Sequence, residues 1–324
     1  MLFKIQKTNK GANNSNSIIK SENKITPTVS EWLKKKPVEK INNSKIETTF
    51  ETKENETKNK FSDIFNKFLL KKKSNSESVC TQTGLKNFET TDIKTLNQRT
   101  VWKDRIDIKY MTNVSLLDSL LQTLSADYLI LENKGNCVSQ YTSEYLDTVD
   151  YKLLRGDNKM NKMKHKIRKR RYNGEDGFWL EIKEVKDNIL KKYRTFNPTP
   201  SEFETFIRTN TPYTSSNLNS SIFTCYDRMT FMHKSLPLKI TLDTNLTVKN
   251  DNRLISFNDL MIIELKSRKN DAASFSNIIE SSLHVKPCGV SKYKIGMASL
   301  HPELKQKISP DTLLNIKKIC KIKL

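Results

Sequence analysis

The chain has 324 residues, enough for one large domain with accessory sequence or for two domains. Lys and Arg number 57 against 36 Asp and Glu, and the formal net charge of +21 indicates a polyanionic partner such as nucleic acid, an anionic membrane or a phosphate polymer. Five widely spaced cysteines without a CxxC pair argue against a disulfide framework and a zinc cluster, and the lack of a long apolar run or signal peptide excludes a membrane span, so we expect a soluble, cytoplasmic protein.

The first region, residues 1–98, is rich in Asn, Ser, Thr, Lys and Glu and poor in large apolar residues. Such a composition buries too little surface to offset the entropy of ordering, so we expect this region to be mostly disordered. Two segments in it, 29–36 and 61–73, place apolar residues at helical spacing ahead of lysines. They could dock as amphipathic helices on an unidentified protein partner or an anionic surface, although chance periodicity in a solvated tail is favoured because short helices are marginal in water.

From residue 99 onward polar and apolar residues alternate in short runs, the period of β-strands. The predicted strands are 105–111, 127–132, 140–148, 164–172, 178–185, 188–196, 223–233, 238–248 and 259–268. Helical spacing predicts helices over 115–124, with Ser115 as N-cap, and over 201–209 and 273–283. We therefore predict a mainly β (α+β) domain over 99–324, with a closed antiparallel β-barrel and flanking helices rather than a doubly wound sheet.

Several of these strands carry charge on a face that an ordinary sandwich would keep apolar. In 164–172, one face presents Lys166, Arg168 and Arg170, and the other presents Ile167, Lys169 and Arg171. Neighbouring strands repeat the pattern, with shared faces formed by Glu181 and Lys183, by Lys192 and Arg194, and by Glu264, Lys266 and Arg268. Rows of this kind suggest a wet, positive barrel lumen in which Arg forks and Lys ammonium groups hold a chain of phosphates.

The inward carboxylates Glu181 and Glu264 admit two interpretations. They could neutralise neighbouring Lys side chains, as inward charges often do. They could instead ligate a divalent cation, and oxygen ligands that bridge to phosphate suit Mg²⁺ or Mn²⁺.

Several motifs in sequential order together point to one family. The run from Lys164 to Arg194, then YDRMTF, LKITLDTNL, LMIIELKSR and GVSKYKIGMASLHPEL, together with the earlier DRIDIKYM and QYTSEYLDT, resembles the VTC domain of polyphosphate polymerases, within the triphosphate tunnel metalloenzymes. The resemblance covers about residues 102–318. It departs from the family at Lys239, where members often carry Arg, a change that keeps the charge and loses the bidentate fork.

The resemblance implies an ATP-dependent enzyme that transfers the γ-phosphoryl group to a growing polyphosphate chain, with Mn²⁺ or Mg²⁺ as cofactor. It implies that the tunnel is lined by Lys109, Arg168, Arg170, Lys183, Lys192, Arg228, Lys239 and Lys292. Of these, Arg168, Arg170, Lys183, Lys192 and Arg228 would also hold the phosphates of ATP, and Glu264, with Glu181 beside it, would ligate the metal. Lys166 and Arg194 are less firmly assigned to the lumen.

Other functions remain as alternatives. A hydrolase of the same fold, such as an RNA 5′-triphosphatase or tripolyphosphatase, would typically use several glutamates where this chain has Arg and Lys, and a catalytically silent polyphosphate-binding module would lack the Glu264 type of metal ligand. The sequence contains no Walker A or GxGxxG pattern, which excludes those nucleotide sites. Nucleic-acid binding through stacking on Phe178 and Trp179 is disfavoured, because adjacent strand residues face opposite ways.

Overall fold

The computed structural model describes residues 82–100, 105–156, 163–172, 175–187, 189–268, 271–307 and 309–321. Residues 1–81, including the two predicted amphipathic segments 29–36 and 61–73, lie outside the described residues. Within the described ranges, no helix is long and apolar enough to cross a membrane.

One eleven-stranded sheet dominates the structure, and nearly all of its pairs are antiparallel. Its main path is, in spatial order, β2 (Arg105–Asn113), β11 (Leu260–Arg268), β9 (Leu238–Lys249), β8 (Asn219–His233), β4 (Val138–Asp147), β5 (Lys164–Tyr172), β6 (Trp179–Lys186) and β7 (Ile189–Phe196). Three short strands join at the sides: β1 (Thr90–Thr91) pairs with β3 (Tyr128–Leu131), β3 with β8, and β10 (Leu254–Phe257) with β9. Each of the nine predicted strands forms, which confirms the mainly antiparallel β class.

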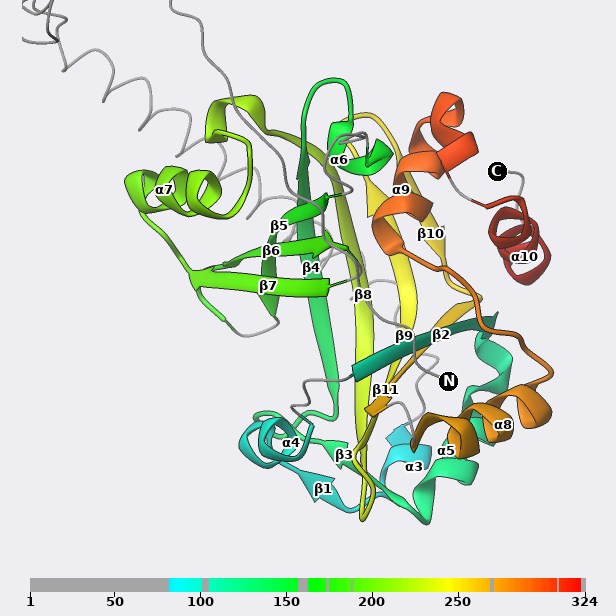
Figure 1. Ribbon diagram of the computed structural model, residues 1–324. Coiled ribbons are helices and arrows are strands. Elements are labelled where there is room, and N and C mark those ends of the chain that lie inside the picture. The colour runs from blue at the N-terminus through cyan, green and yellow to red at the C-terminus, as the bar shows by residue number, and fades with distance from the viewer. Residues whose placement is uncertain are drawn as a thin grey trace, which may run out of the picture. The chain divides into compact units, whose positions relative to one another are not determined.

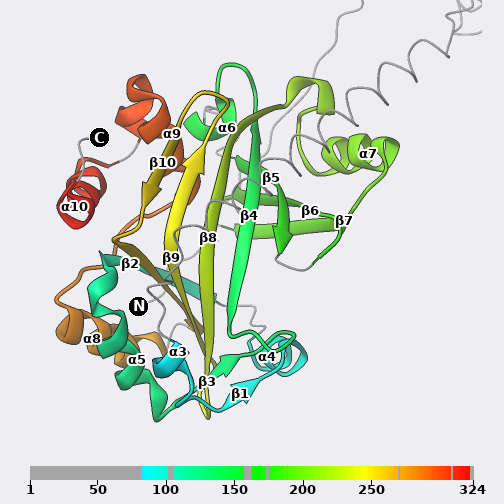
Figure 2. The same cartoon turned by 180° about the vertical axis from the view of Figure 1, so that it is seen from behind.

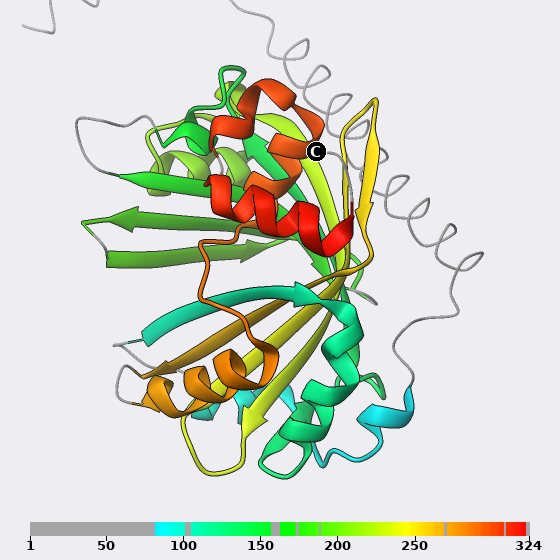
Figure 3. The ribbon, with the colours of Figure 1, turned by 90° about the vertical axis from the view of Figure 1, so that its right-hand side faces the viewer.

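The sheet curls into a half-barrel. Strands β2 and β7 stand at the two ends of the strand order, and the described residues show no backbone pairing between them. Figure 3 shows β5–β7 on one side and β2 with β11 on the other, extending as two arms from the long strands β4, β8 and β9, which Figure 2 shows from behind. The predicted antiparallel barrel architecture with flanking helices is therefore present, but hydrogen bonding does not close it here.

Helices cover the sheet in three groups (Figure 1). The first group, α3 (Gln82–Leu85), α5 (Leu117–Ser125) and α8 (Ala272–Leu283), shares a hydrophobic core with β2, β11, β9 and β8. The second group, α6 (Lys152–Arg155) and α7 (Pro200–Asn210), packs against β4, β5 and β6. The third group, α9 (Lys292–Leu300) and α10 (Pro310–Cys320), packs against β8, β9 and β10. Short 3₁₀ turns lie at η1 (Val114–Leu116), η2 (Ser215–Asn217) and η4 (Pro302–Lys307).

The predicted cap of the first long helix is wrong in detail. Ser115 lies inside η1, and its backbone N–H donates to Asn113 Oδ1 at 2.9 Å. Asn113 therefore caps the turn that leads into α5, since an Asn side chain accepts from the backbone two residues on as readily as Ser does.

The ordered part of the chain begins before the predicted boundary at residue 98. Residues 82–100 form α3, β1 and α4 (Ile93–Arg99), and Leu85, Phe88 and Leu96 are buried. The Phe88 ring packs on Phe231 of β8, with ring centroids 5.1 Å apart. Phe88 and its neighbours thus contribute to the core, and the expectation of disorder remains a prediction for residues 1–81.

Helix α9 approaches the sheet closely at a glycine. A Cβ atom on Gly296 would lie 2.5 Å from the Ile222 side chain and 3.1 Å from that of Val248. Only glycine allows this approach without a shift, and the approach places the first residue of α9, Lys292, beside the inward face of β9.

Candidate functional site

A cavity of about 500 Å³ is lined by side chains from all eight strands of the main path, from α4 and from the residues before α9. All ten residues predicted for the site line it: Lys109, Arg168, Arg170, Glu181, Lys183, Lys192, Arg228, Lys239, Glu264 and Lys292. Lys166 and Arg194, which the sequence assigned less firmly, line it as well. Strand alternation brings the strand residues together because each occupies the inward parity of its strand, and Lys292 joins them from the start of α9.

Positive charge dominates the cavity wall. Among the described lining residues, eleven are Lys or Arg and four are Asp or Glu, an excess of seven positive charges. Such an excess in a partly enclosed space attracts polyanions strongly, because the field of several fixed cations is screened less there than on an open surface.

On the β5–β7 arm the charges form two cross-strand rows. Lys166, Lys183 and Lys192 stand opposite one another on β5, β6 and β7. Like charges directly opposite on a sheet repel, so this row destabilises the arm until an anion binds it. Lys192 is the most exposed of the three. Even so, partial removal from water is the main cause, and neighbouring cations the second, that lower its pKa to about 8.

The second row on this arm is Arg168, Glu181 and Arg194. Both Nε and Nη2 of Arg168 lie 2.6 Å from Glu181 Oε2, and Arg170 Nη1 lies 3.8 Å from the same oxygen. Although burial favours the neutral acid, Arg168 and Arg170 keep the pKa of Glu181 below its usual value. Glu181 therefore pairs with arginines in this structure, rather than with the Lys side chains that the first interpretation named.

Among the described residues, the ion pairs of Glu264 on the opposite arm are with two lysines. Its carboxylate contacts Lys266 Nζ, and its Oε1 lies 3.6 Å from Lys109 Nζ. Burial opposes ionisation, but Lys266 and the nearby Arg228 hold the pKa of Glu264 well below its usual range. The carboxylate is therefore ionised, and its lysine partners are single flexible cations rather than a rigid fork.

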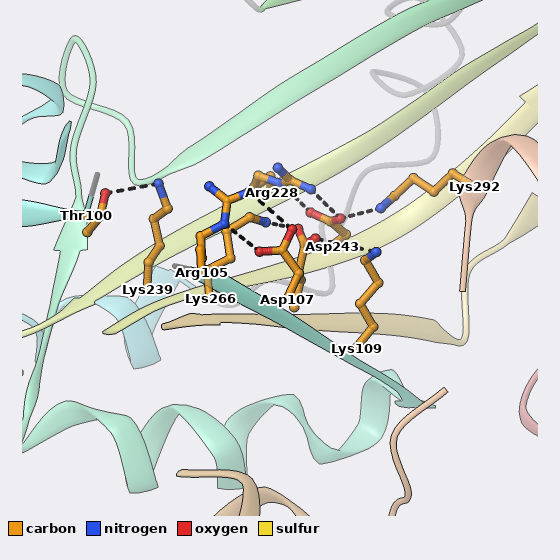
Figure 4. A network of polar contacts seen from close by, with 10 residues as sticks. Thr100, Arg105, Asp107, Lys109, Arg228, Lys239, Asp243, Lys266 and Lys292 are labelled. Carbon is orange, nitrogen blue, oxygen red and sulfur yellow. Dashed lines mark hydrogen bonds and ion pairs between the residues drawn. The ribbon is translucent and has the colours of Figure 1, made fainter. Parts of the chain in front are cut away.

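Asp243 on β9 is a central acid that the sequence analysis missed. Arg228 Nε and Nη2 donate to its two oxygens at 2.5 and 2.6 Å, and Lys292 Nζ donates to Oδ2. Figure 4 shows Asp243 between Arg228 and Lys292. Two predicted cations from β8 and α9 are thus positioned by one carboxylate, whose pKa is lowered by Arg228 and Lys292 against the effect of burial.

A ladder of tyrosines lines the cavity beside the arginines. Tyr172, Tyr141 and Tyr226 stand opposite one another on β5, β4 and β8. Tyr141 stacks on Tyr226 with centroids 5.3 Å apart, and the guanidinium carbons of Arg170 and Arg228 lie 5.2 and 4.9 Å from its ring. Cation–π contacts of this kind hold the arginine side chains in place in the absence of anions.

Tyr145 places a titratable hydroxyl among the cations. Arg168 Nη1 lies 3.4 Å from its hydroxyl oxygen, and its ring stacks on Tyr293. Burial opposes ionisation of this phenol, yet Arg168 and Lys166 lower its pKa to about 8.

The outward face of β5 differs from the cavity face as predicted, but it is not solvated. Lys169 Nζ lies 3.6 Å from the buried Glu144 and 5.6 Å from the ring centroids of Phe178 and Phe203.

On the neighbouring strand, Trp179 lies opposite Arg170, and its ring packs on Phe196 and under the Arg194 guanidinium. Phe178 and Trp179 thus have packing partners already.

A divalent cation would have to be held by protein and phosphate together. The described residues contain no group of three His, Cys, Asp or Glu side chains close enough to hold a metal ion. Mg²⁺ and Mn²⁺ are often bound by one or two carboxylates plus substrate phosphates, so a single ionised carboxylate in a phosphate-binding cavity fits such an ion. Of the four lining acids, Glu181, Asp243 and Asp107 are bonded to arginine, whereas Glu264 is bonded to lysines, which makes Glu264 the best placed to exchange a partner.

Comparison with protein-family models gives one match, the VTC domain, over residues 104–221 and 201–301. A comparison with curated protein sequences found no match.

Among solved structures, the chain is similar to a putative adenylyl cyclase from Hippeastrum described as having a dominant triphosphatase activity, with 12% identity, a TM-score of 0.41, and coverage of 60% of this chain and 96% of that one. It is similar to a putative adenylate cyclase from Vibrio parahaemolyticus, with 10% identity, a TM-score of 0.37, and coverage of 64% and 99%. It is also similar to the S. pombe Pct1 RNA triphosphatase, with 11% identity, a TM-score of 0.25, and coverage of 67% and 93%. Likenesses as weak as these assign no activity to this chain.

Proposed function

This chain belongs to the VTC domain family, and from that premise we propose that it is an ATP-dependent polyphosphate polymerase. The observation that carries the proposal is the cavity, in which eleven Lys and Arg side chains from the sheet and α9 face only four carboxylates. Each of these carboxylates is already paired with a cation. Such a wall binds several phosphates in a row and leaves little negative charge to repel them.

The reaction would transfer the γ-phosphoryl group of ATP to the terminal oxygen of a polyphosphate chain. The bond from the γ-phosphorus to the bridging β–γ oxygen breaks, a new bond forms to the acceptor oxygen, and ADP leaves. Phosphoryl transfer needs alignment and charge stabilisation more than a protein nucleophile, and the acceptor is itself a phosphate oxygen. The described cavity supplies cations for that purpose.

The residues divide the work by position. Arg168, Arg170, Lys183 and Lys192 on one arm and Arg228 near the centre are proposed to hold the ATP phosphates. Lys109, Lys239 and Lys292 are proposed to hold the acceptor chain from the other arm, β9 and α9. Asp243 would keep Arg228 and Lys292 oriented before substrate arrives.

When bound, Mn²⁺ or Mg²⁺ would supply positive charge that offsets the negative charge developing during transfer. Glu264 is proposed to hold that ion together with the phosphates. Lys266 and Lys109, which contact Glu264 here, would then be free to bind phosphate oxygens.

Product analysis tests the proposal directly. The purified protein is incubated with ATP and Mn²⁺ or Mg²⁺, and the products are resolved by chain length. We expect polyphosphate chains and ADP. Release of free phosphate without chains would identify a triphosphate hydrolase instead, and polyphosphate binding without turnover would identify a silent binding module.

The variant Glu264→Gln separates the metal role from phosphate binding. We expect it to lose turnover by about a hundredfold, the upper end of the loss caused by changing residues around a bound metal, while polyphosphate affinity stays within a few fold. The matched control is Glu184→Gln, which makes the same change on β6 at a position that does not line the cavity. Equal metal-dependent rates for both variants would exclude the metal role of Glu264.

A further inference from the structure

The segment before the matched VTC region takes part in the cavity. Residues 82–100 precede residue 104, where the family match begins, yet Ile93, Leu96 and Asn97 of α4 line the cavity wall. Thr100, the residue that ends α4, accepts a hydrogen bond from Lys239 Nζ at 3.2 Å. One of the predicted phosphate-binding lysines is therefore positioned by a residue outside the family match.

Helix α4 is fixed at both ends. Asp92 caps its N-terminus by accepting from the N–H groups of Lys94 and Thr95 at 2.7 and 2.9 Å. Arg99 Nη2 donates to Lys234 O at 2.7 Å near its C-terminus. Leu96 is 3% exposed and anchors the middle. These contacts fix the seven-residue helix α4 in place as part of the cavity wall.

Two ends of the cavity differ in the charge and exposure of the residues that line them. Lys239 with Thr100 lies at one side and Asp243 with Lys292 at the other, as Figure 4 shows. At the Lys292 end, Lys166 Nζ donates to Ser291 Oγ at 3.0 Å, so the cavity there is bordered by charged contacts and by α9. At the α4 end, the lining residues Ile93 and Asn97 are exposed to solvent, and neither is charged.

We propose that α4 forms the mouth through which a polyphosphate chain longer than the cavity reaches solvent, on the side of the cavity where Lys239 bonds Thr100. This inference rests on the proposed function, because it assumes that a linear phosphate polymer occupies the cavity. The two exposed α4 residues that line the cavity, Ile93 and Asn97, are uncharged, so they would not hold a sliding chain where it leaves. Thr100 keeps the Lys239 ammonium at the edge of the cavity.

A charge placed on the rim tests the proposal. Asn97→Glu puts a negative charge and Asn97→Lys a positive charge at the mouth, while Gln98→Glu and Gln98→Lys make the same changes at the next, exposed position of α4, which does not line the cavity. Binding of long-chain polyphosphate and of tripolyphosphate is measured for the full chain and the four variants. Synthesis from ATP is measured in parallel on the unsubstituted protein.

We expect Asn97→Glu to weaken long-chain binding about threefold to tenfold more than tripolyphosphate binding, and Asn97→Lys to strengthen long-chain binding, since a nearby charge acts within a Debye length. Both Gln98 variants should match the unsubstituted protein. Equal effects at positions 97 and 98, or equal effects on long and short chains, would overturn the mouth at α4. Failure of synthesis with a selective Asn97 effect would overturn the polymerase and leave the mouth standing.

Discussion

Two lysines in the cavity lie where their charged form is disfavoured. Lys166 and Lys239 are largely buried and lie near other cations. Burial, and to a lesser degree these cations, lower the pKa of each to about 8. Each lysine loses its charge readily in the free protein and regains it when an anion binds. If the cavity binds phosphate as proposed, we expect these lysines to take up protons on binding.

This coupling predicts the sign of the pH dependence. Polyphosphate needs the ammonium form, so its affinity should be highest below pH 8 and fall by roughly tenfold for each such lysine as the pH rises from 7 to 9. Calorimetry at pH 8 in two buffers of different ionisation enthalpy should reveal proton uptake on binding.

Lys239→Arg is the matched control, because arginine stays charged over this range. It should flatten the decline of affinity above pH 8 and restore the residue common in the family. An affinity that does not change between pH 7 and 9 would contradict the lowered lysine pKa values.

The sequence predicted most of the charged residues that line the cavity, but it missed the acid that pairs with two of them. Alternation placed Arg168 and Arg170 on one face of their strand and Lys183 on one face of the next, and the family resemblance indicated that these faces line the tunnel. Asp243 shares that parity with Lys239 in LKITLDTNL, so the same rule could have found it. Its role could not be read, since its partners Arg228 and Lys292 lie on other elements.

Secondary-structure elements show a different limit of prediction. The strands were found because their alternation is local, but α9 was not, since its residues from Ile295 to Leu300 are buried all round and show no amphipathic period. Closure of the barrel was also beyond the sequence, because it depends on backbone pairing between β2 and β7 rather than on side-chain pattern.

The early elements α3 to α4 make a testable contribution to stability. Phe88 is 6% exposed and packs on Phe231, so Phe88→Ala should lower the free energy of unfolding by about 3–5 kcal/mol. Denaturant titration measures the loss. Asn87→Ala, at the exposed neighbouring position, should change it by less than about 0.5 kcal/mol. Similar values for both would mean that residues 82–100 pack only loosely on the sheet.

At the scale of the whole molecule, the charge of the cavity lowers the stability of the unliganded fold and favours binding of polyanions. An excess of seven positive charges in one cavity destabilises the unliganded fold through repulsion, which a polyanion relieves. Polyphosphate at about a hundred times its dissociation constant should add about 2.7 kcal/mol and raise the Tm by about 5–10 °C.

High salt should reduce this shift, because it screens the same charges. The double substitution of Arg168 and Arg170 by Ala should make the increase in Tm on adding polyphosphate smaller, because two cations that contact phosphate are lost. Thermal melts with and without polyphosphate, at two salt concentrations, measure both effects. An undiminished shift in the double variant would place the binding surface elsewhere.

The pairing of β2 with β11 also governs the order in which the protein can be made. The ribosome completes β2 early, but its partner, and with it the contact between Lys109 and Glu264, emerges only after nearly half the chain has followed. Contacts so distant in sequence fold slowly, since a long loop must close before they form. A nascent chain that ends before β11 leaves both β2 and β9 with an unpaired edge, and a chain that ends before α9 lacks Lys292. Translation must therefore pass residue 292 before the cavity is complete.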